Sequence, residues 1–186
     1  MDTLLFIRHA GTDLAGRFCG HSDPPVNGEG LRQIEQMLKA LKSESIDAVY
    51  SSDRSRSLTT AAAIGRTFGL SPITIADLRE IGFGEWEGLS WPEIELRDRD
   101  YARQWSDAYP NLPAPGGESF EAFESRVLLQ VKHLIAMTSP KCAAVVTHAG
   151  VMRVVLRSLC GFGEQEAWEW TSAYCGFFHY QPGRVR

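Results

Sequence analysis

The chain has 186 residues, of which 44% are hydrophobic and 23% are charged, and its formal net charge is −4. This length allows one domain with a full hydrophobic core, and the composition is ordinary for a globular protein. An acidic chain without a basic stripe argues against nucleic acid or a membrane surface as the general partner. Any cluster of arginines is therefore a local feature, of the kind that binds a small anionic ligand.

The start of the sequence does not have the pattern of an export signal. Its apolar run ends at Arg8 and is preceded by the acidic Asp2, so it is too short and wrongly flanked for a signal peptide. No stretch approaches the length of a transmembrane helix. We expect a cytoplasmic protein, and the sequence does not predict its oligomeric state.

Strands alternate with helices along the sequence. Short apolar runs between turn residues predict strands, and apolar residues at a spacing of three and four predict helices. In chain order, we expect a strand at 3–7, a helix at 28–41 capped by Asn27, a strand at 47–50, a helix at 54–68, a strand at 73–75, helices at 91–105 and 120–135, a strand at 143–147, a helix at 151–159 and a strand at 176–180. This alternation predicts an α/β fold of three layers (αβα), in which the central layer is a mostly parallel sheet.

The segment at about 81–117 differs in kind from the rest of the chain. It contains several Trp and Tyr residues among many charges, and it ends in a Pro-rich run. We predict a small helical and aromatic lid, inserted over one end of the sheet. Residues 1–186 are otherwise expected to form a single domain.

Two of the expected strands are followed at once by a histidine. Arg8 and His9 follow the first strand, and His148 follows the strand at 143–147. Ligands in open α/β sheets bind at the carboxyl ends of the strands. A single histidine at such a place is more often a turn residue, but two of them beside an arginine indicate a site for an anion.

Motifs along almost the whole chain resemble those of the histidine phosphatase superfamily, the phosphoglycerate mutase-like proteins. The segments that carry the resemblance are Leu5–Ala10 with its Arg-His pair, the loop Gly16–Asp23, Tyr50–Arg56 with Thr60 and Ala61, Leu78–Gly88 and Thr147–Gly150. One such motif is a weak signal, whereas this set in the right order is specific. The resemblance implies a single histidine phosphatase domain.

The resemblance also implies a role for individual residues. His9 would be the nucleophile that carries a phosphohistidine, and a backbone acceptor should fix its tautomer. Glu80 would act as general acid and then base, and His148 would be a catalytic group at the phosphoryl oxygens. Arg8 and Arg56 would bind these oxygens, because a guanidinium can donate to two of them.

The remaining substrate-binding candidates are Thr12, Gly20 and Ala149. Thr12 and Gly20 would offer a hydroxyl and a backbone N–H to phosphate. No cofactor and no metal are expected, because arginines and imidazoles supply the positive charge.

Some assignments keep an alternative. Arg54 competes with Arg56, and the resemblance favours Arg56, because the family has its arginine at this spacing from two serines. Glu85 and Glu87 compete with Glu80, although Glu87 is interpreted as part of a packing and turn element.

Other residues are ambiguous or depart from the family pattern. His21 is either near the site or merely exposed, whereas His133 and His179 are interpreted as structural. Ala10 stands where the family has Gly after Arg-His, and Gly11 stands where an acidic residue commonly follows. Ala10 adds only a methyl group, so we expect the mechanism to be retained.

The implied function is the hydrolysis of a small phosphorylated metabolite. The compact loop at 12–23 and the stretch Phe83–Gly88 are most similar to the α-ribazole phosphatase branch, which makes α-ribazole 5′-phosphate a candidate substrate. The alternatives are a broad-specificity sugar or phosphoserine phosphatase and a phosphoglycerate mutase, which the short segment after Glu80 disfavours. A non-catalytic module that binds phospho-ligands is a further alternative, but it would not need Glu80.

Overall fold

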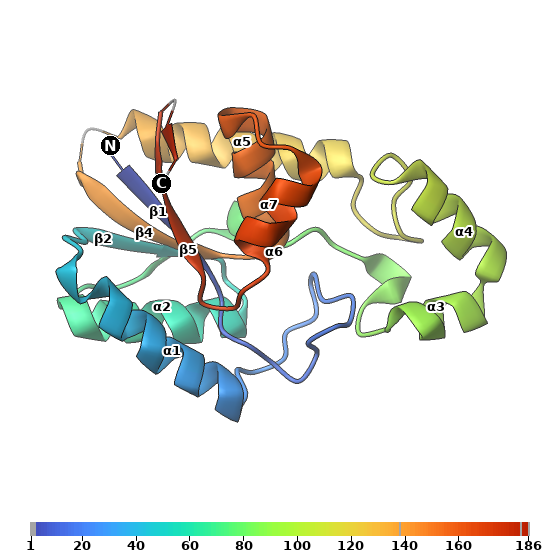
Figure 1. Ribbon diagram of the computed structural model, residues 1–186, viewed down its shortest axis with the longest axis horizontal. Helices are drawn as coiled ribbons and strands as arrows, with labels where there is room; N and C mark the ends of the chain where they lie inside the picture. Colours follow the sequence, from blue (N-terminus) through green and yellow to red (C-terminus); the bar gives the residue numbers. More distant parts are fainter. Residues whose placement is uncertain (1–2, 138, 183, 186) are drawn as a thin grey trace.

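The computed structural model describes residues 3–137, 139–182 and 184–185 (Figure 1). These residues form a six-stranded sheet in the order β3-β2-β4-β1-β5-β6. Its strands are β1 (Thr3–Arg8), β2 (Ala48–Ser51), β3 (Ile73–Thr74), β4 (Cys142–Thr147), β5 (Phe177–Gln181) and β6 (Arg184–Val185). The first four pair in parallel, whereas β5 and β6 pair antiparallel at one edge. The predicted mostly parallel sheet is confirmed.

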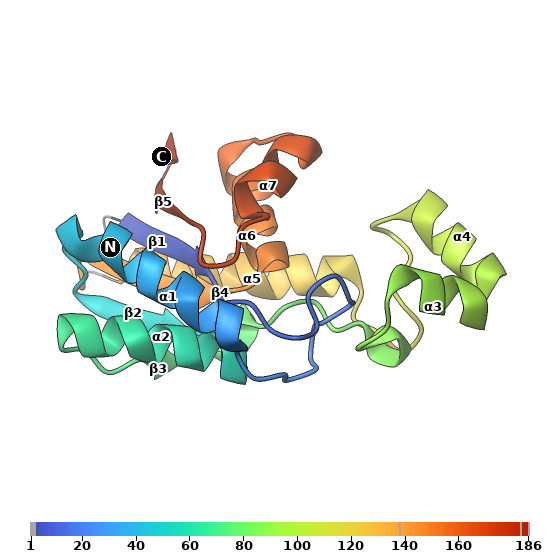
Figure 2. The same ribbon diagram turned by 60° about the horizontal axis from the view of Figure 1, so that its bottom comes forward.

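Helices cover both faces of this sheet (Figures 1 and 2). The helices are α1 (Gly28–Ala40), α2 (Ser55–Phe68), α3 (Trp91–Arg97), α4 (Arg99–Ala108), α5 (Phe120–Ala136), α6 (Ala149–Val154) and α7 (Glu164–Thr171). Successive residues of β1 face opposite layers, because side chains alternate along a strand. Leu5 and Ile7 pack with α1 and α2, while Leu4 and Phe6 pack with α5 and α6. The three-layer αβα prediction is therefore also confirmed.

Local signals begin and end several helices as predicted. The Asn27 side chain accepts a hydrogen bond from the Gly30 N–H at 2.9 Å and caps α1. Gly69 ends α2 with a φ of 70°, a left-handed conformation that glycine adopts at little cost. The Ser119 hydroxyl accepts from the Ala122 N–H at 3.2 Å and caps α5.

The prediction of one continuous helix at 91–105 is wrong. The chain leaves the helical conformation at Asp98, where φ is −155° and ψ is 87°. The Asp98 side chain accepts from the Tyr101 N–H at 3.0 Å, so it caps a second helix. The stretch expected to form a helix at 151–159 is α6, which starts at Ala149, followed by a π-helical turn at Val155–Leu159.

Helix α7 and strand β6 were not predicted. Helix α7 carries only two buried residues, Ala167 and Thr171, so its apolar spacing is too sparse to be detected. Strand β6 is two residues long and pairs with the end of β5.

The lid segment (residues 81–117) leaves and re-enters the main body at neighbouring points. The Glu118 N–H donates to the Gly82 carbonyl at 2.8 Å, and the Glu85 N–H donates to the Pro115 carbonyl at 2.9 Å. Between these stems, α3 and α4 extend beyond one end of the sheet (Figure 1). The lid segment has a small core of its own, which also takes in Phe18; its buried members are Trp86, Ile94, Ala102 and Ala114.

None of the helices in the described part of the chain is both long and apolar enough to cross a lipid bilayer.

Candidate active site

The carboxyl ends of β1 and β4 bring the two predicted histidines together. The strands are neighbours, with Arg8 opposite Thr147 in the ladder, and the His9 N–H donates to the Thr147 carbonyl at 2.9 Å. The ring centroids of His9 and His148 are 5.0 Å apart. Residues far apart in the sequence therefore form one cluster at the end of the sheet.

His9 is held as a neutral imidazole that has a proton on Nδ1 and a lone pair on Nε2. Its Nδ1–H donates to the Ala10 carbonyl at 2.7 Å, the backbone acceptor that fixes the tautomer. The other nitrogen, Nε2, accepts a hydrogen bond from the Arg56 Nε–H at 3.2 Å. Burial and the charge of Arg56 lower the pKa of His9 to about 3. His9 is therefore unprotonated at Nε2 at neutral pH, as a nucleophile must be.

Arg56 is fully buried in the first turn of α2 and is the most highly connected residue of the cluster. Its Nη1 donates to the Ser22 carbonyl at 2.6 Å, and its Nη2 donates to the Gly20 carbonyl at 2.8 Å and the Cys19 carbonyl at 3.3 Å. The same Nη2 lies 3.2 Å from Nδ1 of His148. The structure thus places Arg56 between both imidazoles.

Arg54 occupies a different position from Arg56. It is the half-buried N-cap residue of α2, and its Nε has no hydrogen-bond partner among the described residues. Its charge contributes to lowering the pKa of His148. Arg54 therefore lies near the cluster, but no hydrogen bond in the described structure joins its guanidinium to either imidazole.

Arg8 lies at the edge of the cluster against the chain that follows α7. Its guanidinium stacks over the Tyr174 ring, 3.9 Å from the centroid, and its Nη1 donates to the carbonyls of Thr171 and Ser172. Burial lowers the pKa of Arg8 from its usual value, although arginine remains charged at any ordinary pH. Its buried Nε has no partner in the described residues, a donor that an anionic oxygen would satisfy.

His148 is fully buried at the N-cap position of α6. Because Arg56 donates to its Nδ1, the proton is on Nε2, which donates to the Ser52 hydroxyl at 2.9 Å. Burial, followed by the effects of His9 and Arg56, lowers its pKa well below the usual value. Both imidazoles are thus neutral, and the arginines supply the positive charge.

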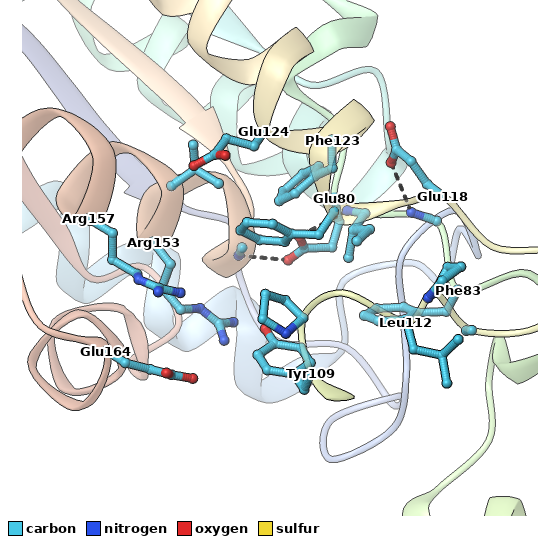
Figure 3. Close-up of a pocket in the computed structure, with 18 of the residues that line it drawn as sticks. Glu80, Phe83, Tyr109, Leu112, Glu118, Phe123, Glu124, Arg153, Arg157 and Glu164 are labelled. Carbon is cyan, nitrogen blue, oxygen red and sulfur yellow. Dashed lines mark hydrogen bonds between the residues drawn. The ribbon is translucent and has the colours of Figure 1, made fainter. Parts of the chain in front are cut away.

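Glu80 is a buried carboxylate that faces a cavity (Figure 3). Its two oxygens accept from the Ile81 N–H at 3.0 Å and the Gly150 N–H at 2.9 Å. Only 8% of the residue is exposed. A Cβ on Gly150 would lie 2.0 Å from the Glu80 carboxylate, so this approach requires glycine.

The structure distinguishes Glu80 from its two competitors. Glu85 is exposed and pairs with Arg97 at 3.3 Å. The Glu87 carboxylate accepts hydrogen bonds from the backbone of residues 20–22. Of the three, only Glu80 lines the large cavity.

This cavity has a volume of about 730 Å³ and lies between the lid segment and helices α5, α6 and α7. Its walls include the aromatic residues Phe18, Phe83, Trp105, Tyr109, Phe120, Phe123, Phe162 and Trp168. Arg153 stacks over the Trp168 ring at 3.6 Å and extends toward Tyr109 and Glu80 (Figure 3). Pockets of this size accommodate ligands as large as typical drug molecules.

The other three substrate-binding candidates make hydrogen bonds within the protein. Thr12 is buried, and its hydroxyl accepts from the Leu14 N–H at 3.3 Å. We expected the Gly20 N–H to donate to phosphate, but it donates to Glu87 at 3.1 Å. Ala149 is buried at the start of α6, and its carbonyl accepts from Arg153 at 3.1 Å.

The remaining histidines lie outside the cluster. His21 is exposed and borders a smaller cavity of about 300 Å³ with Glu118. His133 is exposed on α5, and the His179 ring lies 3.0 Å from a Glu44 oxygen.

The two departures after Arg-His are accommodated locally. Ala10 is fully buried in the core, and its N–H donates to the Thr60 hydroxyl at 3.0 Å. The Gly11 N–H donates to the Gln33 side chain at 2.9 Å.

Sequence reasoning missed Arg126, which fixes the segment that carries Glu80. Its guanidinium donates to the carbonyls of Asp77, Arg79 and Glu80 at 2.8–3.0 Å and pairs with Glu118 at 2.7 Å. The available signal was a charged residue next to the apolar face of the helix at 120–135. Glu87 was interpreted as part of a packing and turn element, but its hydrogen bonds to residues 20–22 were not predicted.

No group of three or more His, Cys, Asp or Glu residues arranged to hold a metal ion is found in the described ranges.

Comparisons with known proteins agree with the motifs. The family model for the histidine phosphatase superfamily (branch 1) matches residues 4–184. A bifunctional protein of Mycobacterium tuberculosis is 34% identical over 157 residues, which cover 83% of this chain and 43% of that protein. This chain therefore spans less than half the length of that relative.

Other relatives match over more of their own length. The adenosylcobalamin/alpha-ribazole phosphatase of Escherichia coli is 27% identical over 167 residues, 89% of this chain and 82% of that protein. A metal-independent phosphoserine phosphatase of Arabidopsis thaliana is 32% identical over 157 residues, 82% of this chain and 66% of that protein. The crystal structure of an alpha-ribazole phosphatase from Shigella flexneri superposes with a TM-score of 0.86 at 24% identity, covering 95% of this chain and 89% of that one.

Proposed function

This chain belongs to branch 1 of the histidine phosphatase superfamily, and we propose that it is a phosphatase that hydrolyses small phosphomonoesters through a phosphohistidine at His9. The observation that carries the proposal is the state of His9. It is neutral, its Nδ1–H is bound to a carbonyl, and its Nε2 lone pair faces the buried charge of Arg56.

In the first step, Nε2 of His9 attacks phosphorus while the bond to the leaving oxygen breaks. Arg8, Arg56 and His148 stabilise the charge on the non-bridging oxygens. A protonated Glu80 gives its proton to the departing alcohol, because an alkoxide does not leave unprotonated at neutral pH.

In the second step, water attacks the phosphohistidine. The Glu80 carboxylate takes a proton from this water as the new P–O bond forms and the P–N bond breaks. Phosphate leaves, the His9 lone pair returns to Nε2, and Glu80 is protonated again. The proton balance closes without a cofactor, and we expect no metal requirement.

We propose α-ribazole 5′-phosphate as the candidate substrate. Support comes from the similarity to proteins named as α-ribazole phosphatases and from the aromatic walls of the cavity next to Glu80, which suit a flat, largely apolar leaving group. A broad-specificity sugar or phosphoserine phosphatase is the alternative, favoured by the Arabidopsis relative. A phosphoglycerate mutase would need a lid that excludes water, and the lid segment here is short.

Two experiments test the proposal. Hydrolysis of α-ribazole 5′-phosphate, phosphoserine, sugar phosphates and 3-phosphoglycerate should be compared by phosphate release, with mutase activity assayed in parallel. Wild-type protein quenched during turnover should carry acid-labile phosphate that His9→Ala lacks and His133→Ala, on the exposed face of α5, retains. Phosphate on another residue, or an active His9→Ala variant, would refute the mechanism.

A further inference from the structure

We propose that Glu87 is a positioning residue that holds Arg56 at the nucleophile through the backbone of residues 19–22. The inference rests on the proposed function, because Glu87 would position Arg56 for the transition state of that reaction. Its basis is the juxtaposition of Glu87 and Arg56 on the two sides of one short loop.

The carbonyl groups of this loop bind Arg56. Those of Cys19, Gly20 and Ser22 accept from the two Nη atoms at 2.6–3.3 Å, while Nε remains directed at His9. The loop therefore sets the orientation of the guanidinium relative to the attacking nitrogen.

The N–H groups of the same loop bind Glu87. One carboxylate oxygen accepts from the N–H groups of Gly20 and Ser22 at 3.1 and 3.0 Å and from the Ser22 hydroxyl at 2.6 Å. The other accepts from the N–H groups of His21 and Phe83 at 2.7 and 3.0 Å. Both oxygens are thus saturated by donors.

The charge of Glu87 follows from these contacts. Burial by itself raises the pKa of Glu87, but the hydrogen bonds from Ser22, Phe83 and His21 outweigh it and hold the pKa below its usual value. Glu87 is an ionised carboxylate at neutral pH. An amide could not replace it, because one of its two ends would point N–H groups at other N–H groups.

The loop at residues 19–22 is closely packed and has little room to move. A Cβ on Gly20 would lie 1.9 Å from the Ile81 carbonyl and 2.8 Å from a Glu87 oxygen. On the neighbouring stretch, the Phe18 N–H donates to the Leu89 carbonyl and the Gly88 N–H donates to the Phe18 carbonyl. The loop is therefore fixed to the stem of the lid segment.

The indirect arrangement has an electrostatic reason. A carboxylate bound directly to Arg56 would neutralise the charge that the phosphoryl group needs, and none of the ion pairs found among the described residues includes Arg56. Backbone carbonyls orient the guanidinium without cancelling its charge. Glu87 supplies the rigidity from the opposite side of the loop.

The test is Glu87→Gln, with Glu85→Gln as the matched control on the same turn. Displacing a transition-state donor by about 1 Å costs on the order of 10²-fold, so we expect kcat/KM of Glu87→Gln to fall by roughly 10–100-fold, equally for good and poor leaving groups. The affinity for vanadate, a mimic of pentacoordinate phosphorus, should fall by the same factor. Glu85→Gln should match wild type in both measurements.

A double-mutant cycle then separates positioning from general destabilisation. Once Arg56 is replaced by Ala, adding Glu87→Gln should cause little further loss of vanadate affinity. Additive losses, or a Glu87→Gln variant with wild-type kcat/KM and vanadate affinity, would overturn the inference.

Two measures keep the test decisive. Vanadate binding by calorimetry needs no turnover, so a wild-type protein that hydrolyses no phosphomonoester would refute the proposed function and still leave the Glu87 effect measurable. If Glu87→Gln does not fold, Ser22→Ala removes only the hydroxyl donor to Glu87 and should give a smaller loss of vanadate affinity in the same direction. Unchanged affinity in Ser22→Ala would then count against the inference.

Discussion

Replacing Glu80 by Gln should separate its two proposed roles, because the variant keeps the shape of the side chain. The carboxylate accepts from Ile81 and Gly150 at 3.0 and 2.9 Å, and an amide oxygen can retain one of these bonds. The variant should therefore fold, while the side chain can no longer donate a proton to a leaving group or take one from water.

The expected magnitude depends on the leaving group. General acid catalysis contributes roughly 10²–10⁴-fold, which corresponds to about 2.7–5.4 kcal/mol of activation free energy at about 1.36 kcal/mol per factor of ten. Ribose 5′-phosphates have a poor alkoxide leaving group and should lose this full factor. Nitrophenolate leaves without protonation, so formation of the phosphohistidine from p-nitrophenyl phosphate should be slowed much less.

The assay is stopped-flow absorbance of nitrophenol beside steady-state release of phosphate. Since Glu80 is also the proposed base for hydrolysis of the phosphohistidine, Glu80→Gln should show a burst of about one nitrophenol per active site and then a slow steady state. Glu85→Gln, an exposed neighbour, should show wild-type kinetics. An equal loss on both substrates without a burst would refute the assignment and leave Glu80 with a structural role.

Other predictions follow from single contacts. Gly150→Ala places a Cβ 2.0 Å from a Glu80 oxygen and should lower kcat by on the order of 10²-fold with little change in KM; an unchanged kcat in steady-state assays would contradict it. Because the folded protein holds His9 at a pKa of about 3, against about 6.5 unfolded, the unfolded state binds the extra proton as the pH falls from 6.5 toward 3. The stability contributed by neutral His9 is present above pH 6.5 and is lost over that range, so the thermal midpoint of His9→Asn should fall less than that of wild type between pH 7 and pH 5. Arg153→Met removes the guanidinium stacked on Trp168 in the cavity wall, so it should raise KM about tenfold, about 1.4 kcal/mol, for phosphate esters of bulky aromatic alcohols. A KM for these esters that is the same in variant and wild type would refute this. A chelator should leave activity intact, and loss of activity that Mg²⁺ restores would show that a metal is required.

The sequence was most informative where chemistry and secondary structure coincide. The convergence of Arg8, His9 and His148 was predictable because they lie at the carboxyl ends of two strands, and neighbouring parallel strands bring such positions to one edge of the sheet. The helix boundaries at Asn27, Gly69 and Ser119 were predictable because capping depends on neighbours within a few residues.

Long-range contacts account for what the sequence did not reveal. Glu87 binds residues 20–22 and Arg126 binds the carbonyl of Glu80, in each case across tens of residues, and no local pattern encodes such pairings. Asp98 was missed for a different reason. The apolar spacing on either side of it is compatible with one helix, and only the backbone geometry shows that its side chain caps a second one.

Phe18 links two parts of the protein that would otherwise be free to vary independently. It directly precedes the residues whose carbonyls bind Arg56. Its ring centroid lies 4.9 Å from that of Phe83, 5.6 Å from that of Trp86 and 5.8 Å from that of Trp105, all in the lid segment. The segment that lines the large cavity is thus joined to the loop whose carbonyls bind Arg56. Under the proposed mechanism, we expect substitutions in the lid segment that change the substrate range to change the catalytic rate as well. We therefore expect that a lid segment taken from a relative must be transferred together with the β1–α1 loop (residues 9–27). Without that loop, the packing around Phe18 would be lost and the Arg56 guanidinium would be displaced.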